Sequence, residues 1–449
     1  MDRKRRVIEN AGVAVADGEI QAVGPIDDVA KGFGSDEVID AEGCIVMPGL
    51  ICSHTHLYGI ALRGSALNIR PPSDFLQILQ RVWWPVDEAL TNDDAYATAL
   101  AAGAESLTNG TTCYADTYSA PNAIEGSLDR IARASNAVGI RGVISFEATE
   151  RRSADEGTRG LKENLRFITS RDKGRAMGMI SLHASFTVSD ELISRGVEAS
   201  RRHDVPLTIH VSEGPNDGYH NIERYGKRSI ERLHERGLLS RRAVLAHCVH
   251  LNQREIGLIA KSSASVAHNP MSNMLNAVGV TPLMEMLDQG VNVGLGNDGY
   301  VFDMFENMRA GFLLQRVARR DPNRPSAQEV VEMSTVNAAR AYGLSSLGSI
   351  EAGKRADIIV VRPTFTATPY SGSIYGYIVN GLRGSDVRDA IVDGQIVMKN
   401  RELLTLDVQK AEEKVLKTME RLWDRLGSSP PEAVESLGQD SHSKKAKSS

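Results

Sequence analysis

Eight short apolar segments, separated by stretches of helical spacing, limit most strongly what this chain can fold into. A typical intervening stretch, residues 92–107, places apolar residues at helical spacing after a helix-capping residue. Strands that alternate with helices form βαβ units and a parallel sheet. Eight such units predict an α/β fold of the (β/α)8 TIM barrel type. The segments are GLICSHTH (49–56), GTTCYAD (110–116), RGVISFEA (141–148), GMISLHASF (178–186), PLTIHVSE (206–213), AVLAHCVHL (243–251), SVAHNPMSN (265–273) and VNVGLGNDG (291–299).

A doubly wound open sheet is the alternative arrangement of the same units. Its dinucleotide-binding form carries the motif GxGxxG after the first strand. No such motif follows GLICSHTH, and its absence favours the barrel.

The two ends of the chain have a different pattern from the middle. Near both ends, apolar and polar residues alternate around Asp-Gly and Glu-Gly turns, which is typical of antiparallel hairpins. We therefore expect residues 1–48 and 351–407 to build one small β-sandwich beside a barrel of residues 49–350. The N-terminal part begins abruptly, as if an opening strand were missing. Residues 408–449 are expected to form an amphipathic helix followed by a polar, disordered tail.

Composition excludes several classes of partner. Apolar residues make up 41% of the chain, and 52 basic residues against 57 acidic ones give a net charge of −5. This balance argues against nucleic acid and anionic membranes. Neither a membrane-spanning run of about 18 apolar residues nor a signal peptide is evident. The four cysteines form no CxxC pair, which argues against a disulfide framework. We expect a cytoplasmic protein.

The placement of the histidines indicates chemistry at one end of the barrel. His54 and His56 end the first segment, and an i, i+2 pair on a strand points to one face. His183, His210 and His247 fall in segments four, five and six. In a barrel, the carboxyl ends of the strands form the active-site mouth. We therefore expect these imidazoles to converge there.

Asp298 ends the eighth segment and completes a set of metal ligands. Taken alone, each histidine could be a core or surface residue, and Asp298 before a glycine could be a turn residue. Together, three imidazoles and one carboxylate at one barrel mouth suit Zn²⁺ or Fe²⁺. The conjunction predicts one divalent metal ion, with Zn²⁺ preferred.

Five ordered motifs resemble the metal-dependent amidohydrolase superfamily. They are PGLICSHTH, TIHVSEG, LAHCVHL, AHNPMSNMLNAVG and GLGNDG, and the resemblance covers residues 13–405. Within the superfamily they resemble the branch of triazine hydrolases and nucleobase deaminases. The tract WWPVDEALTNDD (83–94) and the motif DGYVFDMFENMR (298–309) look closest to SsnA-type aminohydrolases.

The resemblance implies a role for each matching residue. It places the metal ligands on His54, His56, His210 and Asp298. It also implies that Glu213 protonates a ring nitrogen, that His247 holds the hydroxide and stabilises the developing oxyanion, that Asp298 acts as base, and that His183 touches substrate. Relatives with two metals bridge them through a Lys or Glu at strand four, and GMISLHASF offers neither. One metal ion is therefore expected.

Substrate identity is less constrained than the metal site. Trp83 and Trp84 could stack on a flat heterocycle, or pack between a helix and the barrel. Asp87 lies near the position where ribose-binding deaminases of this branch carry a Glu. Phe146 stands near a position where those enzymes have an Arg, which argues against a substrate of the S-adenosylhomocysteine type. Further candidate contacts are Arg63, Glu147 and Arg309.

These observations predict a metal-dependent aminohydrolase that hydrolyses a C–N bond of a purine- or pyrimidine-like heterocycle and releases ammonia. A cyclic-amide hydrolase or a chlorohydrolase could use the same metal site. A third hypothesis is a non-catalytic relative that only binds a ligand. Such a protein would have lost metal-ligating residues or the Glu, whereas here all of these positions carry the expected residues. The resemblance is also compatible with a homo-oligomer.

Overall fold

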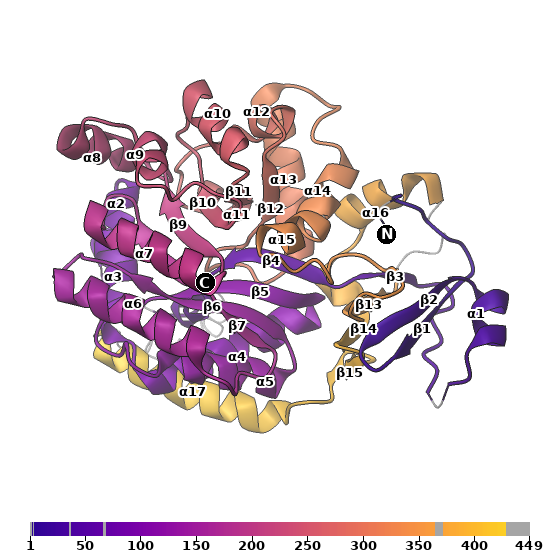
Figure 1. Cartoon of the computed structure of the whole chain (residues 1–449). Helices are drawn as coiled ribbons and strands as arrows, with labels where there is room; N and C mark the ends of the chain where they lie inside the picture. Colours follow the sequence, from indigo (N-terminus) through magenta and orange to yellow (C-terminus); the bar gives the residue numbers. More distant parts are fainter. Residues whose placement is uncertain (1, 3, 36, 66–68, 364–370, 428–449) are drawn as a thin grey trace, which may run out of the picture.

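The central feature of the structure, a computed structural model, is a closed barrel of parallel strands surrounded by helices (Figure 1). The structure describes residues 2, 4–35, 37–65, 69–363 and 371–427. Within these residues, eight strands pair in parallel in chain order. A parallel bridge between Thr55 and Asp298 joins the first strand to the segment that follows the last, which closes the barrel. The predicted TIM barrel is confirmed.

The barrel strands coincide with the eight apolar segments. An additional short strand, β7 (Ala176–Gly178), pairs with β6 beside the barrel. The barrel strands are β4 (Leu50–Thr55), β5 (Thr111–Tyr118), β6 (Arg141–Ala148), β8 (Ile180–Ala184), β9 (Leu207–Val211), β10 (Ala243–His247), β11 (Ser265–His268) and β12 (Asn292–Leu295).

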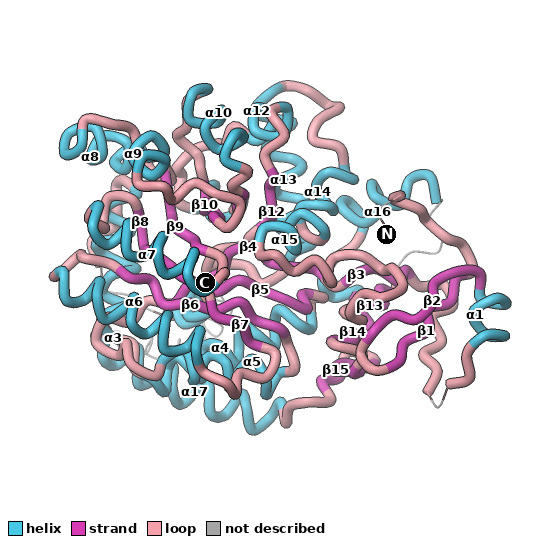
Figure 2. Tube along the Cα trace, viewed as in Figure 1, coloured by secondary structure: helices cyan, strands magenta, loops and turns pink. Residues whose placement is uncertain are grey.

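Helices cover the outside of the barrel, as the tube in Figure 2 shows. In α4, Thr91 and Asp94 form the capping box that a Thr followed by Asp at the third helical position favours. The helices are α4 (Asn92–Thr108), α5 (Ser127–Val138), α6 (Ala154–Thr169), α7 (Asp190–His203), α8 (Pro215–Tyr225), α9 (Ser229–Glu235), α10 (Gln253–Ser262), α11 (Pro270–Leu275), α12 (Leu283–Asp288), α13 (Met304–Arg319), α14 (Ala327–Met333) and α15 (Val336–Ala341).

Short helices between β4 and α4 contribute side chains to the pocket at the barrel mouth, and a second group of short helices lies elsewhere in the chain. The first group is η1 (Leu57–Leu62), α2 (Phe75–Ile78), η2 (Leu79–Trp83) and α3 (Trp84–Ala89). The second group is α1 (Ile26–Gly32), η3 (Ser371–Ser373), α16 (Ile374–Gly381) and η4 (Gly384–Asp386).

Both ends of the chain contribute to a small β-rich unit beside the barrel, as predicted (Figure 1). One sheet is the antiparallel pair β1 (Ala11–Ala16) and β2 (Glu19–Pro25). In the second sheet, β3 from the N-terminal part pairs antiparallel with β13 from the C-terminal part. Ile20, Ile358 and Ile391 share an apolar core of this unit. The second sheet has the order β16 (Glu402–Leu403), β15 (Gln395–Lys399), β14 (Val387–Val392), β13 (Ile358–Val361) and β3 (Ile45–Pro48).

The predicted C-terminal helix is α17 (Val408–Arg425), which packs against α4. Leu422 is fully buried in this contact, and the indole N–H of Trp423 donates to the Ala61 carbonyl at 2.8 Å. The predicted disordered tail lies outside the described residues from 428 onward. The exact domain boundaries stay a prediction. No helix among the described residues is long and apolar enough to cross a bilayer.

Candidate active site

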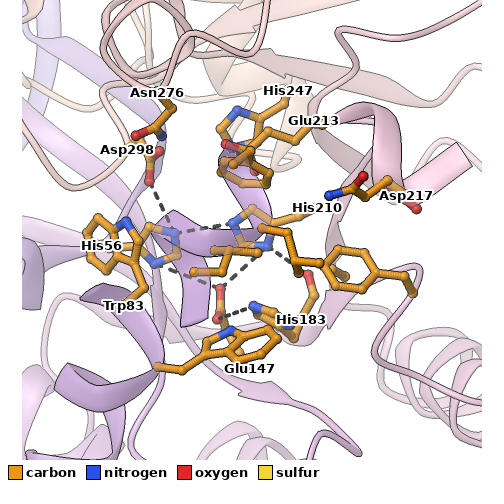
Figure 3. Close-up of a pocket in the computed structure, with 18 of the residues that line it drawn as sticks. His56, Trp83, Glu147, His183, His210, Glu213, Asp217, His247, Asn276 and Asp298 are labelled. Atoms are coloured by element: carbon orange, nitrogen blue, oxygen red, sulfur yellow. Dashed lines mark hydrogen bonds and ion pairs between the residues drawn. The ribbon is translucent and has the colours of Figure 1, made fainter. Parts of the chain in front are cut away.

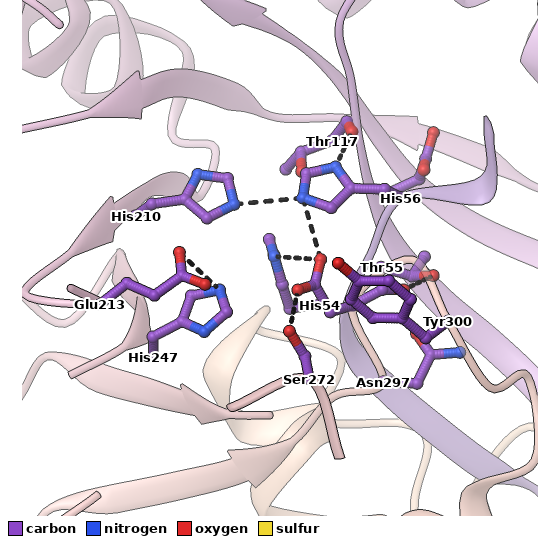
Figure 4. Close-up of polar contacts among 12 residues, drawn as sticks. His54, Thr55, His56, Thr117, His210, Glu213, His247, Ser272, Asn297 and Tyr300 are labelled. Carbon is purple, nitrogen blue, oxygen red and sulfur yellow. Dashed lines mark hydrogen bonds and ion pairs between the residues drawn. The ribbon is translucent and has the colours of Figure 1, made fainter. Parts of the chain in front are cut away.

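The predicted ligands meet at the carboxyl end of the barrel. His54 lies near the end of β4 and His56 directly follows that strand, while His210 lies on β9. Asp298 follows β12, and its backbone φ of 57° lies in the left-handed region. Such strained backbone conformations are concentrated at functional sites. The structure therefore brings all four predicted ligands together. Figure 3 shows His56, His210 and Asp298 around the pocket, and Figure 4 shows His54 beside His56 and His210.

The ligand atoms face one another at short range. His56 Nε2 lies 3.2 Å from His210 Nε2 and 3.2 Å from Asp298 Oδ1. His54 Nε2 lies 3.9 Å from the same carboxylate oxygen (Figure 4). His54 Nε2 is also buried and has no hydrogen-bond partner.

The hydrogen bonds of His56 and His210 indicate which ring nitrogen of each carries a proton. His56 Nδ1 lies 2.7 Å from the Thr117 carbonyl, and His210 Nδ1 lies 2.7 Å from the His183 carbonyl. A carbonyl accepts only, so both Nδ1 atoms must carry a proton, and in a neutral ring the Nε2 atom then presents its lone pair. Two lone pairs and a carboxylate at this range repel one another unless a cation lies between them. The donor set therefore fits a divalent ion such as Zn²⁺.

The electrostatics of these groups suit metal binding. Burial lowers the pKa of His54 well below its ordinary value, and it also lowers the pKa of His210, so both imidazoles are neutral. Burial alone would raise the pKa of Asp298, but His56, His247 and the Ser272 hydroxyl together bring it below the ordinary value. Neutral imidazoles and an ionised carboxylate are the forms that coordinate metal.

His247 ends β10 beside the ligand set, again with a left-handed backbone at φ 71°. Its Nδ1 lies 2.9 Å from Asn273 Oδ1, which leaves Nε2 facing the site. Burial lowers its pKa to about 4. A ligand atom of His247 also lies within 4.8 Å of those of His54 and Asp298, so it is itself a candidate ligand.

Glu213 follows β9 and lines the same pocket. Its Oε2 lies 3.5 Å from His247 Nε2, and the residue is only 8% exposed. Burial raises its pKa well above the ordinary value, and nearby Asp298, Asp217 and Glu147 add to the rise. The carboxyl group is therefore able to hold a proton at neutral pH and to donate it.

Both predicted aromatic residues reach the pocket. Trp83 is 7% exposed, its ring centroid lies 5.8 Å from that of His56, and Trp84 also lines the pocket. A Cβ on Gly299 would lie 2.6 Å from the Trp83 ring, so only glycine allows this approach. His183 lies on β8, its Nδ1 is 2.8 Å from Thr187 Oγ1, and its ring faces the pocket (Figure 3).

Glu147 is one of the three candidate substrate contacts that the sequence could not rank. It lies on the pocket wall at the end of β6. Its Oε1 is buried without a hydrogen-bond partner, 3.6 Å from His210 Nδ1 and 3.8 Å from His56 Nδ1. Oε2 lies 4.0 Å from His183 Nε2. Burial raises its pKa to about 7. The only indication of this position in the sequence was that Glu147 follows Phe146 near the end of the third apolar segment.

A buried ion pair that sequence reasoning missed lies farther along the pocket wall. Arg151 Nη2 donates to Asp87 Oδ2 at 2.8 Å, and the Ser119 hydroxyl donates to the same oxygen at 2.9 Å. Asp87 Oδ1 has no partner and Asp87 lines the pocket. The Arg151 guanidinium lies 5.2 Å from the centre of the Trp84 ring.

Comparison with known proteins identifies the family. Residues 45–397 match the model of the amidohydrolase family, which is most of the chain. The chain belongs to the amidohydrolase family. A 5'-deoxyadenosine deaminase from Methanosarcina mazei is 35% identical over 435 residues, covering 95% of this chain and 97% of the relative. A 5-methylthioadenosine/S-adenosylhomocysteine deaminase from Desulforudis audaxviator is 37% identical over 424 residues, covering 92% and 94%.

Solved amidohydrolase-like structures agree with this assignment. A zinc-bound adenosine deaminase from Xanthomonas campestris has a TM-score of 0.85 and 26% identity, with 95% of each chain covered. The zinc-bound atrazine chlorohydrolase TrzN from Arthrobacter aurescens TC1 has a TM-score of 0.80 and 25% identity, covering 93% of this chain and 97% of that one. The predicted superfamily, the hydrolase class acting on non-peptide C–N bonds and the divalent metal are confirmed. The finer resemblance to SsnA-type enzymes stays a prediction.

Proposed function

We propose that this amidohydrolase deaminates an adenosine-derived nucleoside, replacing the ring amino group by oxygen and releasing ammonia. The observation that carries the proposal is a buried, protonatable Glu213 beside His247, at the edge of a three-histidine, one-aspartate metal set. The relatives named as deaminases of such nucleosides match almost the whole chain, which supports this substrate class.

The metal would be held by His54, His56, His210 and Asp298. When bound, a zinc-type ion lowers the pKa of water towards 7 and so makes a hydroxide nucleophile available at neutral pH. Asp298 Oδ1 faces the centre of the set, and it accepts the proton that the water loses.

Glu213 supplies the proton that the ring needs. Transfer of this proton to the ring nitrogen of the C=N bond makes the adjacent carbon electrophilic, and the water oxygen then bonds to that carbon. The C–NH₂ bond breaks with its electron pair on nitrogen. The departing amine takes up the proton that Asp298 received, and it leaves as ammonia. Glu213 regains a proton from the new hydroxyl group as the ring carbonyl forms.

His247 orients the attacking water. Because its Nδ1–H donates to Asn273, the neutral ring presents the Nε2 lone pair to the site. The side chain therefore accepts a hydrogen bond from water or from the Glu213 carboxyl. The predicted stabilisation of an oxyanion would require a second proton on this ring, which burial disfavours.

Asp87 and the two tryptophans fit the rest of a nucleoside. Trp83 and Trp84 offer flat apolar surfaces for a purine ring. Asp87 Oδ1 is a free buried acceptor on the pocket wall, suited to sugar hydroxyl groups. His183, on the wall near Glu147, is placed to touch the ring.

The charges of the pocket argue against a carboxylate-bearing substituent on the sugar. The guanidinium of Arg151 is engaged by Asp87, and Phe146 is buried in the core. Glu147 adds a further acidic group to the pocket wall. We therefore place a neutral 5'-substituent, as in 5'-deoxyadenosine, ahead of the amino-acid substituent of S-adenosylhomocysteine.

The test is ammonia release by zinc-reconstituted protein from 5'-deoxyadenosine, 5'-methylthioadenosine, S-adenosylhomocysteine, adenine and guanine. We expect the two neutral nucleosides to give kcat/KM at least tenfold above the other compounds. Faster turnover of a free base would move the substrate class to nucleobases, and chloride release from a chlorotriazine with no ammonia would favour the chlorohydrolase alternative. Cytoplasmic location and homo-oligomerisation stay predictions.

A further inference from the structure

A chain of hydrogen bonds joins the aromatic wall of the pocket to the carboxylate of Asp298. The Trp83 indole N–H donates to the Tyr300 hydroxyl at 3.1 Å, and that hydroxyl donates to Asn276 Oδ1 at 3.0 Å. Asn276 Nδ2 donates to Ser272 Oγ at 3.2 Å. The Ser272 hydroxyl in turn donates to Asp298 Oδ2 (Figure 4).

The direction of every bond in this chain is fixed by chemistry. An indole N–H donates only, so the Tyr300 oxygen accepts from Trp83 and sends its single proton to Asn276. The Asn276 amide must then offer its N–H to Ser272, whose only proton is left for Asp298. The chain therefore ends on a carboxylate oxygen, the acceptor that makes the strongest hydrogen bonds of this kind.

The residues of this hydrogen-bond chain are shielded from bulk water. Ser272 is fully buried, Asn276 is 7% exposed and Asp298 is 5% exposed. A buried polar group that loses its partner cannot recover a hydrogen bond from bulk water. A break at any link therefore propagates to the next group rather than being absorbed by solvent.

The chain controls which oxygen of Asp298 faces the metal set. Oδ2 is held by Ser272, which leaves Oδ1 directed at His56 Nε2, 3.2 Å away. At the other end, Tyr300 holds the edge of Trp83, whose ring lies 5.8 Å from the His56 ring. The wall that a substrate ring contacts and the base that accepts the proton are thus parts of one hydrogen-bonded unit.

We propose that Tyr300, Asn276 and Ser272 are positioning residues that couple the seating of the substrate ring against Trp83 to the alignment of Asp298. This inference rests on the proposed deaminase function. It predicts that the hydrogen-bond chain acts as a unit, so that a break at either end misaligns Asp298 and a second break adds no further loss.

The experiment is a double-mutant cycle with Tyr300→Phe and Ser272→Ala in the full-length zinc protein. Tyr300→Phe deletes a single oxygen, and Asn276→Ala breaks the chain at the next link if that variant does not fold. The matched control is Tyr114→Phe, because Tyr114 is also buried but its hydroxyl contacts Ser135 on α5, away from the pocket. The readouts are kcat and KM for the best nucleoside, and the zinc dissociation constant from competition with a chromophoric chelator.

We expect Ser272→Ala to weaken zinc binding or lower kcat by about 10- to 100-fold, as substitutions of groups that support metal ligands do. Tyr300→Phe is expected to lower kcat about 5- to 50-fold, with KM changed less than kcat. The double variant should match Ser272→Ala, because Ser272→Ala already interrupts the hydrogen-bond chain and the second substitution then has no further effect on Asp298. Tyr114→Phe should leave kcat and zinc binding unchanged.

Two results would overturn the proposal: additive effects of the two substitutions, or a Tyr300→Phe variant indistinguishable from Tyr114→Phe. The zinc dissociation constants test the hydrogen-bond chain independently of the proposed deaminase activity. If no compound is deaminated, non-additive changes in zinc affinity still support the chain, and additive or absent changes reject it.

Discussion

Replacement of Glu213 by Gln tests the proton donor of the proposed reaction. The side chain is 8% exposed, and burial raises its pKa well above the ordinary value, so the fold favours the neutral, protonated form of its carboxyl group. Gln has the same shape and keeps an N–H donor, but it has no proton to transfer. General acid catalysis of this kind contributes about 10²- to 10⁴-fold, which is ~3–5 kcal/mol of activation free energy.

The expected result is a loss of that size in kcat, measured by ammonia release from the best nucleoside. KM should change little, because Gln retains the hydrogen bond to a ring nitrogen. The melting temperature should stay close to that of the wild type, since one neutral buried group replaces another. Zinc content, measured by atomic emission, should remain at one ion per chain.

Glu163→Gln provides the matched control for this substitution. Glu163 is also a buried glutamate, but it pairs with Arg166 on the outside of the barrel. Its replacement should lower stability and leave kcat unchanged. A zinc-replete Glu213→Gln enzyme with kcat within tenfold of the wild type would refute the reasoning, because Glu213 could then not be the proton donor.

Three further outcomes follow from the structure. Chelation of the metal should abolish ammonia release and lower the melting temperature, because His56, His210 and Asp298 then repel one another, and zinc should restore both; an unchanged melting temperature would contradict this. Burial raises the pKa of Asp116 to about 8 in the folded protein, above the ordinary value of 3.8. The protonated carboxyl group therefore stabilises the fold fully below pH 4, and this contribution is lost as pH rises through 8. Urea unfolding at pH 5, 6.5 and 8 should therefore show a decline of up to ~1.4 kcal/mol per pH unit that Asp116→Asn flattens; equal slopes would contradict it. Leu422→Ala should cost about 2–5 kcal/mol of unfolding free energy by leaving a cavity between α17 and the barrel, measured by denaturant unfolding with activity as the control.

The barrel and the metal set were predictable because their signals are local and repeated. Each strand is a short apolar segment, and the His54–His56 pair on one strand already fixes a common face. Because all parallel strands end at the same rim, residues as distant in sequence as His56 and Asp298 could be expected to meet. The sandwich from both chain ends followed from the shared hairpin pattern.

The pocket wall was less predictable because its partners are set by tertiary packing. Nothing near Arg151 in sequence indicates that it pairs with Asp87, 64 positions away. The hydrogen bond from Trp83 to Tyr300 spans 217 positions and depends on the close approach that Gly299 permits. Glu147 carried a weak signal, its place near a strand end, but only the structure shows which imidazoles surround it.

The dependence of activity on a single metal ion can be measured by titrating zinc into metal-free protein while ammonia release from 5'-deoxyadenosine is followed. We expect no ammonia without metal, and activity that rises linearly to a plateau at one zinc ion per chain. Ammonia release by the metal-free protein, or a plateau that requires two ions per chain, would contradict the single metal set formed by His54, His56, His210 and Asp298.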